Sequence, residues 1–287
     1  MINQANNQVN FSEQQFVHHK RFSVIRLTFS VAAIGILFIF LIGFGVQQLL
    51  TNTTSLGTLA SDIRTLGTIA FVASLVSLIL YFVTAFKLRN RNTTLAWFWG
   101  LIIADVISYG ITLGVLLTLA TTQLRELIDF KFSDIVFAFL GAALVYGTVW
   151  GLSALPSQQR RYQQTQTLFR IFIWAFFISI IASLLTFVLN FTVFRGGRTN
   201  ILDLLFPGLS LIVGGIFSLL SVYFVCLQIR NEQDLVKLYE SQDPALAKAQ
   251  MWRSALFFGA WLVSSFMNLV YFILRIILLT RNLSRAF

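Results

Sequence analysis

Seven long runs of mainly apolar residues follow one another along the chain, separated by short polar or charged segments. About 20 apolar residues at a rise of about 1.5 Å each cross a hydrocarbon core of about 30 Å, so each run can span a bilayer. In lipid, an unbroken run of this length satisfies its own backbone only as a helix. The pattern predicts an all-α polytopic membrane protein, a bundle of seven transmembrane helices within residues 24–287. The runs cover residues 24–49, 66–86, 95–119, 135–155, 171–194, 204–227 and 255–279.

The polar segments at the start and near the end of the chain are expected to lie in water. Residues 1–23 are rich in Asn and Gln and lack the apolar side chains that a core needs, so they predict a mobile cytoplasmic tail. The adjacent His18 and His19 have no third ligand nearby and are expected to be solvated rather than to bind a metal. Residues 228–254 carry four basic and four acidic side chains and form a charged linker between the last two runs.

The composition narrows the class of protein. Hydrophobic residues make up 57% of the chain and charged residues 11%, whereas a soluble protein has about 25% charged residues. The net charge of +10 comes from basic residues that lie beside the apolar runs. This placement favours a role in orienting the protein in the membrane over nucleic-acid binding. The runs contain no histidine, and the chain has no phosphate-binding glycine loop or HExxH motif. We therefore expect neither an enzyme nor a cofactor.

The basic residues predict an orientation in the cell membrane. With a cytoplasmic N-terminus, 13 of the 21 Lys and Arg residues fall on the cytoplasmic side, 7 fall on the other side, and Arg275 lies inside a run. An excess of cytoplasmic Lys and Arg is the usual arrangement, so we expect the N-terminus inside and the C-terminus outside. The cytoplasmic set is Lys20, Arg21, Arg26, Lys87, Arg89, Arg91, Arg160, Arg161, Arg170, Arg230, Lys237, Lys248 and Arg253.

Asp105 is the candidate for intramembrane chemistry, because it lies about 15 Å inside the third run. An ionised aspartate there costs about 2.5–3.5 kcal/mol, so it should be paired, protonated or next to a wet cavity. The alternatives are a place in an ion pathway or a neutral carboxyl group hydrogen-bonded to Ser108 or a neighbouring helix. Arg275 is not the expected partner, because it lies about 15 Å further along the membrane normal.

Two further patterns concern the faces of the helices. Ser264, Asn268, Tyr271 and Arg275 fall within about 60° of one another on a helix and predict a polar stripe that faces the bundle interior. With Ser265 and Asp105, they are the candidate pathway residues. Glycines four residues apart let helices approach closely in a membrane and predict packing faces. They occur as Gly110 with Gly114, and as Gly147 with Gly151.

The end of the chain resembles the Bax inhibitor-1 family. Residues 221–230 read SVYFVCLQIR, a charged segment follows, and the last run has Asn268 seven residues before Arg275. The resemblance implies a central last helix and a calcium leak closed by a proton-sensitive pair of facing aspartates. Those two positions correspond here to Val225 and Ser265, which cannot share a proton as coupled carboxyl groups do. We therefore expect that any flux lacks a steep pH dependence between about 6 and 8.

Three kinds of function stay open at this point. The resemblance implies a cation leak or a regulator of ion homeostasis, with calcium or protons as the ions. A small-solute transporter is the second, although the sequence shows no paired broken helices and no clear repeat. The third is a non-conducting membrane scaffold that interacts with other proteins. The lipid bilayer is the expected partner in all three, nucleic acid in none, and the oligomeric state is open.

Overall fold

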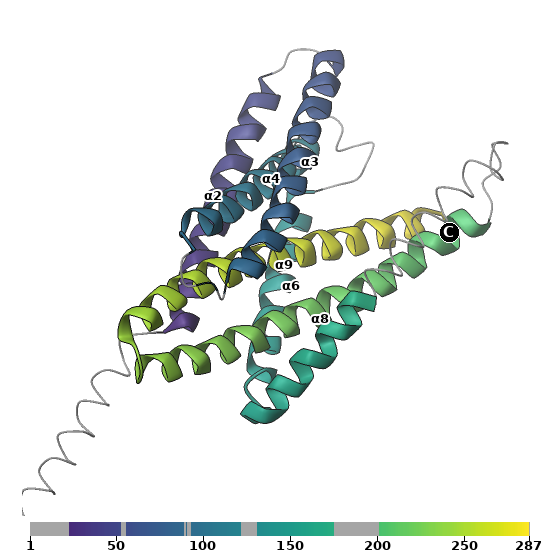
Figure 1. Cartoon of the computed structure of the whole chain (residues 1–287). Helices are drawn as coiled ribbons and strands as arrows, with labels where there is room; N and C mark the ends of the chain where they lie inside the picture. Colours follow the sequence, from purple (N-terminus) through teal and green to yellow (C-terminus); the bar gives the residue numbers. More distant parts are fainter. Residues whose placement is uncertain are drawn as a thin grey trace, which may run out of the picture. The chain divides into compact units, whose positions relative to one another are not determined.

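A computed structural model describes residues 23–52, 56–88, 90, 93–121, 131–174 and 201–286 (Figure 1). All regular secondary structure within these residues is helical, which confirms the predicted all-α class. The predicted tail lies outside the described residues except for Ser23, which caps α2 by accepting a hydrogen bond from the backbone N–H of Arg26. Residues 158–174 are also helical. The long helices are α2 (Val24–Thr51), α3 (Leu56–Lys87), α4 (Ala96–Thr121), α6 (Phe132–Leu152), α8 (Ile201–Glu240) and α9 (Pro244–Ala286).

Five of these helices are long and apolar enough to cross a bilayer, which makes the protein a polytopic membrane protein. The predicted run 171–194 lies outside the described residues beyond residue 174, and the run 204–227 lies within α8. The five spanning segments are Val24–Thr51, Asp62–Lys87, Ala96–Thr118, Phe132–Leu152 and Pro244–Ile277.

The charged segment between the last two runs is helical, not an extended linker. Helix α8 continues to Glu240 and α9 begins at Pro244, so only residues 241–243 interrupt the helices. The segment is rich in Leu, Ala, Lys, Glu and Gln, which favour helices in water as well as in lipid. Asp243 accepts hydrogen bonds from the backbone N–H groups of Ala245 and Leu246 and caps α9. Apolar periodicity located the membrane part of these helices and could not show that they extend beyond it.

The chain divides into two compact units. Unit 1 comprises Met1–Phe137 and Ile229–Met267, and unit 2 comprises Ala138–Gln228 and Asn268–Phe287. Helices α8 and α9 each contribute to both units, since the divisions fall inside them.

Close packing of α2 against α4 organises unit 1. A Cβ atom on Gly114 would lie 2.5 Å from Cβ of Val46 and 2.7 Å from the backbone oxygen of Gly43, so glycine is required there. Gly110 approaches Ile42 in the same way. Contacts advance along both helices in the same direction, which means that α2 and α4 are parallel. The Gly110 and Gly114 spacing is thus a helix contact, as predicted, whereas Gly147 and Gly151 have nothing within 4 Å among the described atoms and their packing role stays a prediction.

The last helix, α9, packs against other helices in both units. In unit 1, α9 places Gly259 against Val31 of α2, and Tyr81 of α3 makes edge contacts with Phe257 and Trp261. In unit 2, Phe272 lies against Gly215 of α8, and Ile273 lies against Gly141 of α6. Within each unit, therefore, α9 has the central place expected for it.

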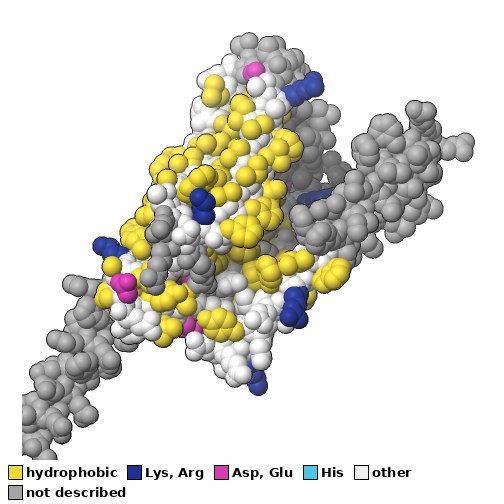
Figure 2. Space-filling view, viewed as in Figure 1, with side chains coloured by type: hydrophobic (Ala, Val, Ile, Leu, Met, Phe, Trp, Pro, Cys, Tyr) yellow, Lys and Arg dark blue, Asp and Glu magenta, His cyan; other side chains and the backbone are white. Residues whose placement is uncertain are grey.

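Large hydrophobic side chains cover the outer face of α2 and α3 (Figure 2). Phe71 is 63% exposed, Phe86 is 84% exposed and Leu41 is 57% exposed. A contiguous apolar surface of this kind is rare on soluble proteins, where patches seldom exceed a few hundred Å². The bilayer supplies the missing cover, in agreement with the membrane class.

Candidate intramembrane polar site

Asp105 lies in the middle of the α4 span and is 3% exposed. Its two carboxylate oxygens accept hydrogen bonds from α3, Oδ1 from the Ser77 hydroxyl and Oδ2 from the Tyr81 hydroxyl at 2.8 Å. Ser77 and Tyr81 are four residues apart and therefore share one face of α3. Asp105 was expected to need partners in the membrane. It has two hydrogen-bond donors, and both lie on α3, the helix that precedes α4.

Two more hydrogen bonds fix α4 to its neighbours. Ser108 donates to the backbone oxygen of Ala70 on α3 at 3.1 Å. The hydroxyls of Tyr109 and Ser264 share a hydrogen bond of 2.8 Å that joins α4 to α9. Ser108 and Tyr109 lie three and four residues after Asp105, so this side of α4 meets both α3 and α9.

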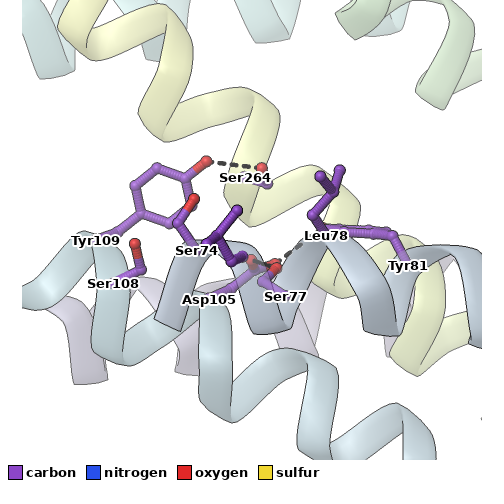
Figure 3. Close-up of a pocket in the computed structure, with 9 residues that line it drawn as sticks. Ser74, Ser77, Leu78, Tyr81, Asp105, Ser108, Tyr109 and Ser264 are labelled. Carbon is purple, nitrogen blue, oxygen red and sulfur yellow. Dashed lines mark hydrogen bonds between the residues drawn. The ribbon is translucent and has the colours of Figure 1, made fainter. Parts of the chain in front are cut away.

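These side chains enclose a cavity of about 230 Å³, shown in Figure 3. Six hydroxyl groups and one carboxyl group line it, and Leu75 and Leu78 complete the wall. Leu78 is 50% exposed, so the α3 wall of the cavity reaches the surface of the helix bundle. The hydroxyl groups belong to Ser74, Ser77, Tyr81, Ser108, Tyr109 and Ser264.

The cavity offers oxygen ligands and one acidic group. Oxygen donors suit protons and hard cations, while imidazole and thiolate suit the softer transition metals. No group of three His, Cys, Asp or Glu side chains suited to a metal ion occurs within the described part of the chain. One carboxylate balances one positive charge, so a proton or a monovalent cation matches this cavity best.

The predicted polar stripe on α9 has one member, Ser264, at the cavity, and the inward-facing role of the other three stays a prediction. Ser264 lines the cavity, as expected of an inward-facing residue. Asn268 and Arg275 are exposed, and Tyr271 is half-buried. Helical spacing alone placed the four residues on one face, but Ser264 belongs to unit 1 and the other three to unit 2, so that face has different neighbours on either side of Met267.

Val225 and Ser265, the two positions that the resemblance to the Bax inhibitor-1 family would align with its aspartates, are both buried. Val225 on α8 is fully buried in unit 2. Ser265 is 6% exposed in unit 1 and donates a hydrogen bond to the backbone oxygen of Trp261 at 2.8 Å, one turn earlier in its own helix. The hydroxyl that stands in place of the second carboxylate is therefore engaged by the backbone, and the expectation that the two positions face each other stays a prediction.

Sequence reasoning found Asp105 but missed most of its surroundings. Ser74, Ser77 and Tyr81 follow one another at intervals of three and four in the second run, and Ser108 and Tyr109 lie three and four residues after Asp105 in the third. Two polar stripes on consecutive apolar helices were the available signal. Ser and Tyr are common in membrane helices, so neither stripe stands out without the carboxylate between them.

Comparison with known proteins gives a relative of high sequence identity. The Mycoplasma genitalium (strain ATCC 33530 / DSM 19775 / NCTC 10195 / G37) protein described as "Uncharacterized protein MG320" is 72% identical over 273 residues, which cover 95% of this chain and 94% of that protein. The chain belongs to the family of this mycoplasma protein. About 14 of the 287 residues are left unmatched, fewer than any spanning helix contains, so the match reaches at least part of every described span. No family model matches the chain, and no solved structure matches it.

Proposed function

We propose that the protein is a membrane ion-homeostasis protein that binds a proton or a small monovalent cation in the cavity around Asp105. The observation that carries this proposal is a carboxyl group within a membrane span that opens onto a cavity lined by hydroxyl groups. Ionisable residues inside spans are rare and typically mark ion pathways or proton relays. In this role Asp105 holds the charge, and the surrounding hydroxyls replace the water that an ion loses on entry.

The size of the cavity favours an ion over a larger solute. Pockets for drug-sized molecules measure about 300–1,000 Å³. The cavity of about 230 Å³ is smaller than that range, and the hydroxyl groups that line it make it polar. An ion with one or two waters fits this space, so the small-solute transporter is the weaker reading.

The ligand set favours a single positive charge over calcium. Calcium takes about 6–8 oxygen ligands, usually including several carboxylates. Among the described residues, Asp105 is the only acid that lines the cavity. Serine and tyrosine hydroxyls can turn from donating to accepting, which lets Ser77 and Tyr81 serve either the free carboxylate or a bound cation. The calcium selectivity implied by the resemblance to the Bax inhibitor-1 family therefore has no support in this cavity.

A non-conducting scaffold is the second candidate, and one observation favours it. Both oxygens of Asp105 already accept hydrogen bonds from α3. Buried polar groups that are fully satisfied can hold helices together without any transport function. In that case the carboxyl group fixes α3 to α4, and the cavity is a packing defect.

Ion flux into liposomes that contain the purified protein separates the two candidates. We expect flux of protons, Na⁺ or K⁺ in the wild type and its loss in Asp105→Asn, which keeps the shape of the side chain and removes its charge. Asp62→Asn is the matched control, because Asp62 is an exposed acid on α3 that does not line the cavity. Its flux should equal that of the wild type.

The remaining outcomes decide against the proposal. If the folded wild-type protein passes none of these ions, the non-conducting scaffold is the function that remains. Flux that is selective for calcium contradicts the monovalent assignment, and flux that Asp105→Asn leaves unchanged places the pathway elsewhere.

We also propose that the N-terminus is cytoplasmic and the C-terminus extracellular. The support is the excess of Lys and Arg in alternate connecting segments of a helical membrane protein. Single cysteines in residues 1–22 should react with a membrane-impermeant maleimide only after intact cells are opened. Labelling of intact cells at these positions contradicts the orientation.

A further inference from the structure

An apolar groove lies between α2 and α4 in unit 1, and none of its lining residues lines the Asp105 cavity. Above it, Gly110 and Gly114 bring the two helices into contact. Towards their N-terminal ends, the two helices line a hollow of about 300 Å³. The lining consists of Val31, Ile34, Gly35, Phe38 and Ile42 of α2 with Trp99, Ile102, Ile103, Val106 and Ile107 of α4.

The groove opens to the surroundings of the protein. Ile34 is 55% exposed, Phe38 is 50% exposed and Ile103 is 56% exposed. All of them lie within spanning segments, so the medium outside the groove is the hydrocarbon of the bilayer. Because α2 and α4 are parallel, the groove runs along the helices. From Val31 to Ile42 it extends about 16 Å, about half of a hydrocarbon core of about 30 Å. That is the depth of one leaflet.

A basic side chain stands at the end of the groove nearest the start of α2. Arg26, Ser30, Ile34, Phe38 and Ile42 follow one another at intervals of four and form a single ridge on the helix surface. The last three line the groove, while Arg26 and Ser30 are exposed beyond its end. Among the described residues, the guanidinium group of Arg26 makes no ion pair or hydrogen bond.

The charge at this end comes from Arg26 rather than from the helix terminus. The Arg26 N–H donates to the Ser23 side chain, and the Ile25 N–H donates to Oε1 of Gln233 at 3.4 Å. These first-turn amides are therefore engaged by the protein itself. The guanidinium group, in contrast, offers a planar set of donors that matches a phosphate.

We propose that the groove binds one acyl chain of an anionic phospholipid whose phosphate group lies at Arg26. The apolar walls take the chain, the depth of one leaflet matches its length, and the arginine selects the headgroup. Trp99 lines the groove near the start of α4, in the position near a membrane interface where tryptophan is common. This site does not depend on the function of the Asp105 cavity.

Photochemical crosslinking in liposomes tests the proposal. Phosphatidylglycerol and phosphatidylcholine, each with a diazirine in one acyl chain, are compared at equal fractions in a bilayer of unlabelled phosphatidylcholine, and peptide mass spectrometry locates the labelled residues. One basic side chain near a charged headgroup is worth about 1 kcal/mol, so we expect the labelled phosphatidylglycerol to mark residues 34–42 and 99–107 about fivefold more than the labelled phosphatidylcholine.

Two variants and two matched controls assign the site. Arg26→Gln should abolish the preference for phosphatidylglycerol, while Arg64→Gln, at an exposed arginine of α3, should leave it unchanged. Ile103→Phe should fill the groove and reduce labelling by both lipids. Ile79→Phe, at a position that is 61% exposed and lines neither hollow, should not.

Three results would overturn the proposal. Labelling that is as strong on the exposed face of α3 as in the groove means that lipid merely surrounds the protein. Labelling of the groove with no headgroup preference removes the role of Arg26. Protection of the groove from both lipids, together with a dimer in crosslinking of the protein itself, means that a second copy of the chain is the occupant.

Discussion

The hydroxyl groups of Tyr109 and Ser264 lie 2.8 Å apart and join α4 to the last helix across the cavity that holds Asp105. Interhelical hydrogen bonds between side chains in membrane proteins contribute about 0.6 kcal/mol on average and at most about 1.7 kcal/mol. The contact is therefore a modest part of the stability of unit 1, but it fixes the rotation of α9 relative to α4.

We predict that Tyr109→Phe and Ser264→Ala each lower the free energy of unfolding by about 0.5–1.5 kcal/mol. The double variant should be little less stable than either single variant, because both changes remove the same hydrogen bond. Unfolding in detergent measures all three. Fully additive losses would show that the two hydroxyls are not coupled.

Two substitutions of Asp105 should separate the effect of its charge on stability from the effect of its hydrogen bonds. Asp105→Asn keeps an oxygen that accepts from Ser77 or Tyr81, so we expect the helices to stay folded with little loss of stability. Asp105→Leu removes both acceptors and should lower the free energy of unfolding by about 1–3 kcal/mol for each buried hydroxyl left without a partner. Thermal unfolding in detergent distinguishes them. Equal stability of the two variants would mean that the hydrogen bonds contribute nothing measurable.

The two glycine pairs should respond oppositely to alanine. At Gly114 a methyl group would overlap Val46 and the backbone of α2, so Gly114→Ala should force the helices apart and lower the free energy of unfolding by about 1–3 kcal/mol. At Gly147 nothing lies within 4 Å among the described atoms, so Gly147→Ala should be neutral or stabilise the helix by up to about 1 kcal/mol. A large loss of stability in Gly147→Ala would show that another part of the protein packs against that face of α6.

The pair of helices α8 and α9 should depend on a buried polar cluster. Glu232 is 2% exposed, and its Oε2 accepts hydrogen bonds from the Ser254 hydroxyl at 2.9 Å and from Nε2 of Gln250 at 3.4 Å. We expect Ser254→Ala to lower the free energy of unfolding by about 1–3 kcal/mol, because a buried carboxylate loses a donor. Hydrogen exchange of the α8 amides near Glu232 should rise.

Ser241→Ala is the control for this cluster. Ser241 is exposed in the turn between α8 and α9 and donates only to the backbone oxygen of Leu238. An exposed change of this kind alters the free energy of unfolding by less than about 0.5 kcal/mol. If it destabilised the protein as much as Ser254→Ala, the loss would belong to the turn and not to Glu232.

The membrane helices could be predicted from the sequence because lipid leaves a long apolar run no alternative to a helix. The start of α2 at Val24 and the end of α3 at Lys87 lie within a residue of the predicted boundaries. The extension of α8 to Glu240 was missed, because water permits a charged segment to be helix or loop, and the choice depends on packing. Val236, for example, is fully buried in a cluster with Val24 of α2, which only the folded chain brings near.

The candidate site could also be predicted only in part from the sequence. The energetic cost of an acid in lipid singled out Asp105 from sequence alone. Its partners depend on how α3 is rotated about its axis, and an apolar run does not specify that rotation. Spacing likewise defined a face of α9 without defining its neighbours, so only Ser264 of that face could be assigned to the cavity.

The order of the partners of Asp105 along the chain has a consequence for biosynthesis. The two donors, Ser77 and Tyr81, lie on α3, and the acceptor lies on the helix that follows. Domains form as the chain emerges from its N-terminus at about 5–20 residues per second, so α3 is made a few seconds before Asp105. Helix α4, which carries Asp105, is therefore inserted after α3, which carries the hydrogen-bond donors of Asp105. Moving Asp105 to the face of α3 and its donors to α4 would preserve the final contacts but would send an unpartnered acid into the membrane first.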